Sequence, residues 1–580
     1  MANGKIAIVG GGLAGLMAAL KVAETGLDVD IFSLVPFKRS HSACAQGGMN
    51  AALDTKGEGD SIDEHFFDTI YGGDFLANQR QVRGMCEAAP SIVNLFDRMG
   101  VMFNRTPEGL LDLRRFGGTQ KRRTVFAGST TGQQLLYALD EQVRALVAQG
   151  RVREFVGWEF VSVIMHDGRC CGLTAQDLDS MEIRSFAADA VIIATGGCGA
   201  VFGKSTNSTI STGYAAARCY RQGAKYANGE FVQIHPTAIP GLDKNRLMSE
   251  SARGEGGRIW TYKDGKPWYF LEEKYPAYGN LVPRDVAARE IFDVVMNQHL
   301  GVEGQNVVYL DVTQIPEKVL SEKLEGILDI YRKFVGEDPR KVPMRVAPSV
   351  HYSMGGLWVG LDQQTSVPGL FAAGECDYTQ HGANRLGANS LLSAVYGGMV
   401  AGPAASQYVQ GLAAGDMPAC VFDEAARRDK ADYEGILALD GPENAYALHQ
   451  EMGELMTRNV TVVRDNTTLA KTLEELDAIE ERFSRIGIRD SSAWCNGDAP
   501  FVRQLRGMMD LAKVVTTGAL ARNESRGSHY KPEFPQRNDA EWLKTTIATY
   551  GEKTGEPELS YEAVDTSLLA PCERDYTKTR

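Results

Sequence analysis

The sequence lacks the cysteine patterns that mark metal centres and dithiol redox sites. Its ten cysteines include no Cys-x-x-Cys pair, and their spacing is not typical of zinc or iron–sulfur ligands. We therefore expect no metal bound by this chain and no disulfide-reductase chemistry. A reduced, cytosolic protein is the simplest interpretation.

Basic residues and long apolar runs are also scarce. Lys and Arg number 61 against 74 Asp and Glu, and the net charge of −13 argues against nucleic acid as a partner. The longest apolar stretch, Ile6 to Ala19, is interrupted by four glycines and is not a membrane helix. The start, MANGKIAIVGGG, enters a strand at once and leaves no room for a signal peptide. We expect any link to a membrane to run through a partner protein.

Glycine is abundant, and its first cluster lies between a strand and a helix. The opening segment predicts a strand at Lys5 to Val9 and a helix at Leu13 to Ala23. Between them Gly10, Gly12 and Gly15 form G-x-G-x-x-G. The first two glycines permit close approach of a pyrophosphate, and the third lets the helix pack on the strand. This unit predicts a dinucleotide site.

One feature usual in such a unit is missing. An acidic residue commonly ends the second strand and holds a ribose. Here VDIFS places Ser33 at that position, and Asp30 points to the other face in a period-two count. We expect Ser33 to replace the usual ribose contact.

The whole chain, at 580 residues, is too long for one core, and the part after the opening segment divides into regions of different sequence pattern. ADAVIIATGGCG and PGLFAAGECDYTQHGANRLGANSLLSAVYGG each predict a further strand followed by a glycine-bearing turn. The segment between them looks like an insertion. After it, Leu469, Leu473, Leu476, Ile479 and Phe483 form one apolar helix face, and the polar residues after Tyr550 predict a surface arm.

We therefore expect an α/β chain with a Rossmann-like nucleotide domain, an inserted α+β capping domain, a helical domain and a C-terminal tail. The expected bounds are 1–235 with 351–430 for the nucleotide domain, 236–350 for the capping domain, 431–540 for the helical domain and 541–580 for the tail.

Polar side chains that suit chemistry lie in Gly- and Pro-rich turns in and beside the insertion. Any one of them alone is more often a structural residue than a catalytic one. Their gathering in turns between apolar segments favours a site, because loops on a rigid scaffold are where sites are built. The candidates are His235, Ser249, Glu250, Arg253, Arg284, His351 and Arg385.

These ordered motifs resemble the flavoprotein subunit of succinate dehydrogenase and fumarate reductase. RSHSACAQGGMN is similar to that family's flavin-attachment segment, and FGGTQ to its substrate-side loop. HPT, RGEGG, PRD, HYSMGG and HGANRLGANSL are similar to its active-site signatures. The run CEAAPSIVNLFDRMGVMFNRTPEGLLDLRRFGGTQ is most similar to the branch whose membrane anchor is a single di-haem cytochrome b polypeptide.

The resemblance implies FAD bonded covalently to His41. Such a bond should raise the flavin's reduction potential, which matters because succinate is a poor reductant. Some relatives hold FAD without the bond, so a structural role for His41 stays open. The resemblance also implies cofactor contacts at Gly10, Gly12, Ala14, Gly15, Ser33, Ser40, Gln46, Gly47, Gly48, Ala194, Thr195, Gly196, Glu375, Asn389, Ser390 and Leu391. Where the family commonly reads TGDG this chain reads TGYA, so Tyr214 is not expected to contact the flavin.

The implied substrate is a C4-dicarboxylate, whose two charged ends need donors to replace water. Arg385 and His351 are expected at one carboxylate, and His235 and Ser249 at the other, with Gly47 and Phe116 beside the reacting carbons. The family commonly has threonine where this chain has Ser249, so binding is expected to be slightly looser. The resemblance assigns proton delivery to Arg284, fed through Glu250 and Arg253, although a structural ion pair stays an alternative.

The expected function is interconversion of fumarate and succinate, with electrons exchanged with quinone through an iron–sulfur subunit and a cytochrome b anchor. The expected location is the cytoplasmic face of the cell membrane, held there by those partners. Two alternatives are open: an L-aspartate oxidase-like enzyme with non-covalent FAD, and a non-enzymatic flavin electron carrier.

Overall fold

The computed structural model describes residues 4–413 and 417–578. At its centre is a five-stranded parallel sheet in the order β19-β10-β1-β2-β6. The strands are β1 (Lys5–Val9), β2 (Asp28–Ser33), β6 (Val152–Val156), β10 (Ala190–Ile193) and β19 (Leu370–Ala372). The expected strand, turn and helix at the start of the chain are all present.

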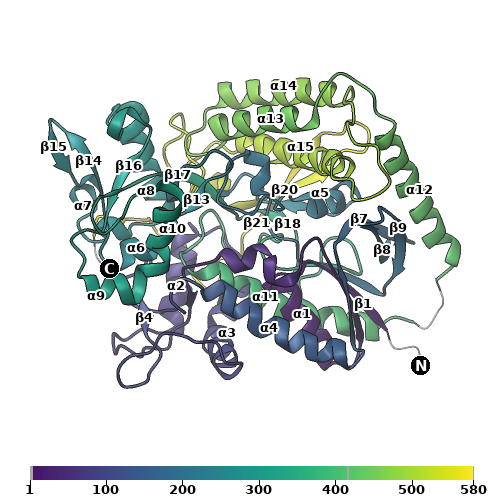
Figure 1. The fold of residues 1–580 in the computed structure, drawn as a ribbon, viewed down its shortest axis with the longest axis horizontal. Helices are drawn as coiled ribbons and strands as arrows, with labels where there is room; N and C mark the ends of the chain where they lie inside the picture. The colour runs from purple at the N-terminus through teal and green to yellow at the C-terminus, as the bar shows by residue number, and fades with distance from the viewer. Residues whose placement is uncertain (1–3, 414–416, 579–580) are drawn as a thin grey trace.

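Helices pack on one face of this sheet and a second sheet on the other. The helices are α1 (Leu13–Glu24), α4 (Thr131–Ala148) and α11 (Asn389–Gln410), and α1 contacts both others (Figure 1). The second sheet has the order β7-β8-β9, with strands Trp158–His166, Arg169–Asp177 and Ile183–Ala187. A Cβ on Gly15 would lie 1.9 Å from the Gly10 carbonyl oxygen, so only glycine lets α1 approach β1 this closely.

Two further helices and a small sheet complete this part of the fold. They are α2 (Ile62–Gly72), α3 (Gln79–Arg98) and the strands β3 (Met49–Asn50), β4 (Leu113–Arg114) and β5 (Thr124–Val125). The segment between α1 and α2 carries the histidine of the expected flavin-attachment motif.

The inserted region is built on a six-stranded sheet in the order β13-β12-β17-β16-β14-β15. Its strands are β12 (Val232–Ile239), β13 (Arg246–Leu247), β14 (Arg258–Lys263), β15 (Lys266–Trp268), β16 (Val308–Asp311) and β17 (Met344–Ser353). Its helices are α6 (Ser251–Gly254), α7 (Phe270–Lys274), α8 (Arg284–Phe292), α9 (Glu317–Val319) and α10 (Glu325–Val335).

The expected boundaries of this insertion, 235/236 and 350/351, fall inside β12 and β17. These two strands pair with each other, with His235 opposite Ser349 and Val232 opposite Ser353. Both expected boundaries therefore lie within paired strands rather than in loops. The sequence placed them at motifs, whereas the hydrogen-bonded ladder continues through both motifs into the nucleotide domain.

The helical region follows the expected apolar pattern. It contains α12 (Ala419–Leu437), α13 (Ala445–Asn459), α14 (Asn466–Phe483) and α15 (Asp498–Ala521), with α5 (Tyr214–Arg221) packed on α15. Leu469, Leu476 and Ile479 of α14 are buried, and Leu473 and Phe483 pack against the same core. No helix among the described residues is long and apolar enough to cross a membrane.

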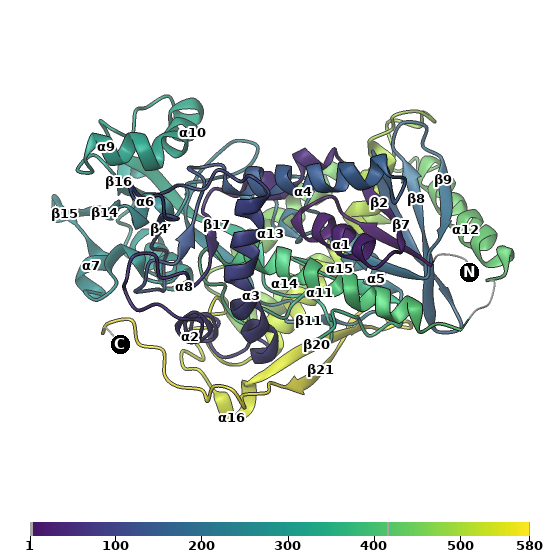
Figure 2. The same ribbon diagram turned by 90° about the horizontal axis from the view of Figure 1, so that it is seen from below.

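The C-terminal tail lies at the surface after Gly551, as its polar composition predicts, but it is paired with the rest of the fold. It contributes β20 (Lys544–Tyr550) and β21 (Pro557–Ala563) to a sheet in the order β18-β11-β20-β21, in which β18 is Gly356–Leu357 and β11 is Tyr226–Ala227. Beyond them the tail runs along the molecule to the inserted region (Figure 2). The Arg574 side chain is largely covered there and lies between Asp74 and Asp285, with Nη1 at 3.1 Å from each carboxylate. The charge of Arg574 is thus paired, which composition alone does not reveal.

Candidate active site

A cavity of about 610 Å³ lies at the carboxyl ends of the parallel strands and extends to the inserted region. Ligands bind at this edge in open α/β sheets. Its wall includes most of the expected site residues: Gly10, Gly12, Ala14, Ser33, Ser40, His41, Gln46, Gly47, Gly48, Phe116, Ala194, Thr195, Gly196, His235, Ser249, Glu250, Arg284, His351, Glu375, Arg385, Ser390 and Leu391.

Three expected site residues do not reach this cavity. Gly15 packs against β1, which is the packing role expected of the third glycine. Arg253 is buried behind Glu250. Asn389 was expected to contact the cofactor, but its side chain faces the protein interior, where Oδ1 accepts hydrogen bonds from Asn50 Nδ2 and His65 Nε2 and Nδ2 donates to Thr69. Buried polar partners from α2 and β3 thus hold the Asn389 side chain, and contact of this residue with the cofactor stays a prediction.

The nucleotide half of the cavity presents polar groups without partners. The hydroxyls of Ser40 and Thr195 and the Oε1 atom of Gln46 are buried and have no hydrogen-bond partner in the protein. Such atoms are rare in native proteins unless a ligand or water satisfies them. Ser40 and Thr195 lie beside Gly12 and Gly10 of the glycine turn, and the three atoms offer two hydroxyl donors and one amide acceptor to a dinucleotide.

The second strand behaves as its alternation predicts. Ser33 lines the cavity and its hydroxyl donates to the Val35 carbonyl at 2.7 Å. Asp30 is turned away and accepts two hydrogen bonds from Arg153, at 2.7 and 2.6 Å. Tyr214, which is not expected to contact the flavin, also lines the cavity wall, and its hydroxyl donates to the Val161 carbonyl at 2.7 Å.

His41 lies on the cavity wall and is held through both ring nitrogens. The Ser208 amide donates to Nδ1 at 3.2 Å, and Asn207 Nδ2 lies 3.4 Å from Nε2. Burial and then the positive charge of Lys244 lower the pKa of His41 to about 4. The imidazole is therefore neutral at physiological pH, which leaves it able to act as a nucleophile.

Gly47 is where backbone must come close to an aromatic ring. A Cβ at this position would lie 3.0 Å from Cζ of Phe116, which is itself buried. Arg114 donates from Nε to the Gly47 carbonyl at 3.0 Å, and its guanidinium carbon lies 4.1 Å from the centre of the Phe126 ring. Arg114 thus fixes the backbone of Gly47 beside the Phe116 ring.

Glu250 is the centre of a buried charge cluster. Arg284 donates from Nε and Nη2 to Glu250 Oε2, at 2.9 and 2.7 Å. The other carboxylate oxygen accepts from the Gly117 amide at 2.8 Å and lies 3.1 Å from Arg253 Nη2. Burial would raise the pKa of Glu250, but the charges of Arg284 and Arg253 outweigh it and lower that pKa below its ordinary value. The carboxylate therefore stays ionised between two guanidinium groups.

Arg385 and two histidines form the remaining polar wall. Arg385 stacks over Tyr352 with 4.4 Å to the ring centre, its Nε atom has no partner, and burial followed by the charge of Arg284 lowers its pKa to about 9. His235 and His351 lie edge to face with ring centres 5.0 Å apart. Burial and the nearby charge of Arg284 lower the pKa of both rings well below the ordinary value. An anion between these groups would relieve the unbalanced positive charge.

The sequence reasoning missed Gln233 and Thr206. Gln233 accepts from Arg284 Nη1 at 2.8 Å and donates to the Arg385 carbonyl at 2.7 Å, so it links the two arginines. It lies two residues before His235 on β12, and a period-two count from His235 could have found it. Thr206 hydrogen-bonds His351 Nδ1 at 2.7 Å, and no local pattern marks it.

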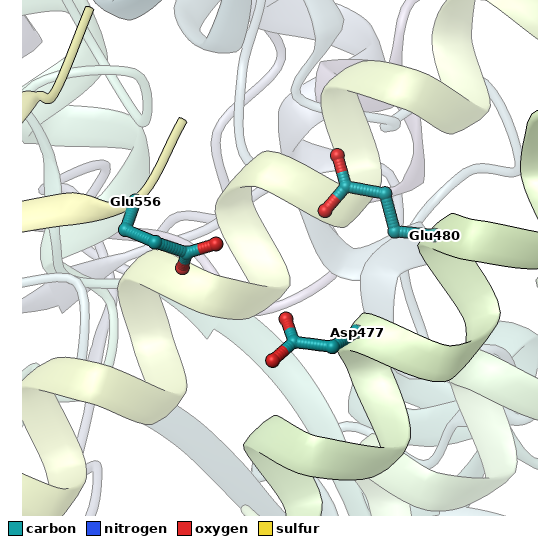
Figure 3. Close-up of side chains that lie close together, drawn as sticks. All are labelled: Asp477, Glu480 and Glu556. Carbon is teal, nitrogen blue, oxygen red and sulfur yellow. The ribbon is translucent and has the colours of Figure 1, made fainter. Parts of the chain in front are cut away.

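One group of carboxylates elsewhere has the spacing of a metal site. Asp477 and Glu480 of α14 point toward Glu556 of the tail (Figure 3). Lys513 of α15 lies among them, with Nζ at 2.7, 2.6 and 2.8 Å from Asp477, Glu480 and Glu556. The Lys513 ammonium group thus occupies the position that a metal ion would take among these carboxylates.

Comparison with known proteins identifies the family to which this chain belongs. Residues 5–391 match the FAD binding domain family and residues 449–576 the fumarate reductase flavoprotein C-terminal family. The chain is 64% identical to the succinate dehydrogenase flavoprotein subunit of Bacillus subtilis over 583 residues, with 100% of both chains covered. It is 33% identical to the fumarate reductase flavoprotein subunit of Escherichia coli, covering 98% of this chain and 95% of the other.

Solved structures agree. The flavoprotein of Escherichia coli quinol fumarate reductase superposes with a TM-score of 0.93 at 32% identity, covering 100% of this chain and 99% of the other. Mycobacterium smegmatis Sdh1, solved in complex with UQ1, gives 0.83 at 30% identity, covering 98% and 95%. With this sequence, fold and cavity, the chain belongs to the flavoprotein subunits of succinate dehydrogenase and fumarate reductase, which are FAD-dependent oxidoreductases.

Proposed function

We propose that this chain interconverts fumarate and succinate at the described cavity, with FAD attached to His41 and with Arg284 delivering the proton. The observation that carries the proposal is the buried cluster of Arg284, Glu250 and Arg253 at the wall of a cavity that also presents Arg385, His235 and His351. Bound FAD would supply the two-electron chemistry of the reaction.

The polar wall fits a dianion. Arg385 has a free Nε atom and His235 a free Nε2 atom, and both are buried. One carboxylate would take the Arg385 guanidinium with His351, and the other would take His235 and the Ser249 hydroxyl. Charge-assisted hydrogen bonds of this kind offset the free-energy cost of removing water from the anion. Phe116 would lie against the carbons between the two ends.

Arg284 is suited to proton delivery because it faces the cavity and because Glu250 and Arg253 can return a proton to it. A guanidinium gives up a proton only if another group replaces it at once. Glu250 contacts Arg284 through one oxygen and Arg253 through the other, so it can carry a proton between them. Arg253 in turn donates to the Asn280 carbonyl at 2.6 Å, which holds the outer end of this path.

His41 is suited to flavin attachment because its ring is neutral and fixed at the cavity wall. Because the Ser208 amide donates to Nδ1, the proton of the neutral ring lies on Nε2, and Nε2 would form the bond to the flavin with loss of that proton. Mass spectrometry of the peptide that contains residue 41 tests this directly. An unmodified peptide from the flavin-loaded protein would contradict the attachment, and a yellow denatured pellet would support it.

We further propose that electrons pass to or from quinone through an iron–sulfur subunit and a cytochrome b anchor, which hold the chain at the cytoplasmic face of the cell membrane. The support is the naming of relatives as subunits and as quinol fumarate reductase. Purification with native partners, followed by measurement of quinol:fumarate against succinate:quinone rates, tests the partners and the direction together.

The decisive test of the reaction is dye-linked turnover by the flavin-loaded chain. We expect succinate-dependent reduction and fumarate-dependent oxidation of an artificial dye, and no turnover of L-aspartate. Aspartate oxidation with a colourless denatured pellet would favour an L-aspartate oxidase-like enzyme instead. A bound flavin without turnover of any of these acids would favour an electron carrier.

A further inference from the structure

Ser249 is paired with a second serine that the expected mechanism does not use. Ser249 and Ser251 lie on either side of Glu250, and both are buried, with 1% and 0% of their surface exposed. Their hydroxyl oxygens lie 2.5 Å apart, and the Ser251 amide donates to Ser249 Oγ at 3.3 Å. Ser249 lines the cavity, whereas Ser251 does not.

The direction of the hydrogen bond between the two hydroxyls follows from their partners. Among the described residues, Ser249 Oγ is the one hydrogen-bond partner of the Ser251 hydroxyl, so the Ser251 hydrogen has no other acceptor. A serine oxygen accepts two hydrogen bonds and donates one. Ser249 Oγ therefore accepts from the Ser251 hydroxyl and from the Ser251 amide, and its own hydrogen remains for the cavity.

We propose that Ser251 is a positioning residue that fixes the Ser249 rotamer and turns the Ser249 hydrogen toward a substrate carboxylate. This deepens the proposed function and rests on it. It also accounts for serine where threonine is common in the family: a threonine methyl restricts the χ1 angle, and here the paired hydroxyl does so instead. A donor that is already aimed costs less ordering when the anion binds.

The expected effect lies in binding more than in turnover. An interaction made equally in the bound and reacting states changes KM and leaves kcat. For Ser251→Ala we expect the KM for fumarate and the Kd for malonate to rise about five- to tenfold, the worth of one such hydrogen bond, while kcat changes less than about twofold. Malonate binding is read from the absorbance change of the flavin in the loaded protein, which needs no turnover.

Rescue separates positioning from packing. In the double variant Ser249→Thr with Ser251→Ala, the threonine methyl should fix the rotamer and return the malonate Kd to within about twofold of the unaltered protein. Ser406→Ala is the matched control, because Ser406 is also buried and donates to the Gly402 carbonyl at 2.9 Å within α11. It should leave the Kd unchanged.

Two results would overturn the proposal. One is a Ser251→Ala protein whose malonate Kd and fumarate KM equal those of the unaltered protein. The other is a loss that the threonine does not restore, because Ser251 would then act through packing. If the unaltered, flavin-loaded protein fails to bind malonate or any C4-dicarboxylate, the proposed function itself is wrong, and this outcome is distinct from the first two.

Discussion

Arg284 donates from both Nε and Nη2 to a single carboxylate oxygen of Glu250, Oε2, at 2.9 and 2.7 Å. A bidentate pair would use both oxygens. Here the second oxygen is left for Arg253 and for the Gly117 amide. The carboxylate thus joins two arginines that are far apart in sequence, and a proton relay needs this arrangement.

Replacing Arg284 by Ala should strongly reduce turnover and leave dicarboxylate binding mostly intact. A positioned proton donor contributes about 10²- to 10⁴-fold to rate, so kcat should fall by about that factor. Steady-state kinetics and malonate titration measure the two effects. Arg289 is the control, because it lies on the same helix but pairs with Asp285 and donates to the Gly527 carbonyl. Arg289→Ala should keep its turnover, and an active Arg284→Ala protein would show that the proton takes another path.

Replacing Lys244 by Ala should lower the fraction of protein that carries covalent flavin. Lys244 reaches from the β12–β13 loop to donate to the Asn207 carbonyl, and residues 207 and 208 contact both nitrogens of His41. Without this anchor the imidazole should be less well aimed. Flavin fluorescence of the denatured protein on a gel measures the fraction.

Lys204→Ala is the matched control for that variant. Lys204 donates to the Gly241 carbonyl of the same loop at 3.1 Å but does not hold the segment beside His41. We expect its covalent fraction to stay normal. Equal labelling of the Lys244 and Lys204 variants would argue that the loop has no part in placing His41.

Stability should fall as pH drops from neutrality. His235 and His351 have pKa values well below the ordinary value of about 6.5, because burial and the charge of Arg284 disfavour protonation. Below about pH 6.5 these two histidines bind protons in the unfolded chain but not in the folded protein, so the free energy of unfolding decreases. The thermal midpoint between pH 7 and pH 5 records this. His235→Gln should make the thermal midpoint depend less on pH over this range, whereas replacement of the exposed His299 by Gln should not change that dependence.

Lys513→Met should destabilise the helical region. Its ammonium group is 7% exposed and lies among three carboxylates, which raise its pKa against the opposing effect of burial. Removing it leaves these charges to repel one another, at a cost of about 1–3 kcal/mol. Because the folded pKa is raised, the contribution of Lys513 is present below pH ~10.4 and is lost as pH rises through the folded value.

Urea unfolding of the Lys513 variant and of Lys471→Met gives the comparison. Lys471 forms an exposed pair with Glu475 one turn along α14, at 3.5 Å, and its loss should cost less than about 0.5 kcal/mol. Equal losses from the two variants would mean that the carboxylate cluster relaxes into solvent.

Local sequence was sufficient for the elements that form from neighbours. The glycine turn predicted β1, α1 and the nucleotide half of the cavity, because its three glycines act within a few residues of each other. Apolar periodicity predicted the buried face of α14 for the same reason. Polar composition predicted an exposed tail but not the ion pairs of Arg574 with Asp74 and Asp285, which come from distant parts of the chain.

The sequence by itself determined which residue types this site has and the order in which they occur. Only the tertiary structure decided that Glu250 touches Arg284 and Arg253 with different oxygens, that Asn389 turns inward, and that Gln233 joins Arg284 to Arg385. These contacts depend on strand register and on the direction of each side chain. Both are fixed by packing between segments far apart in the chain, so no local pattern contains them.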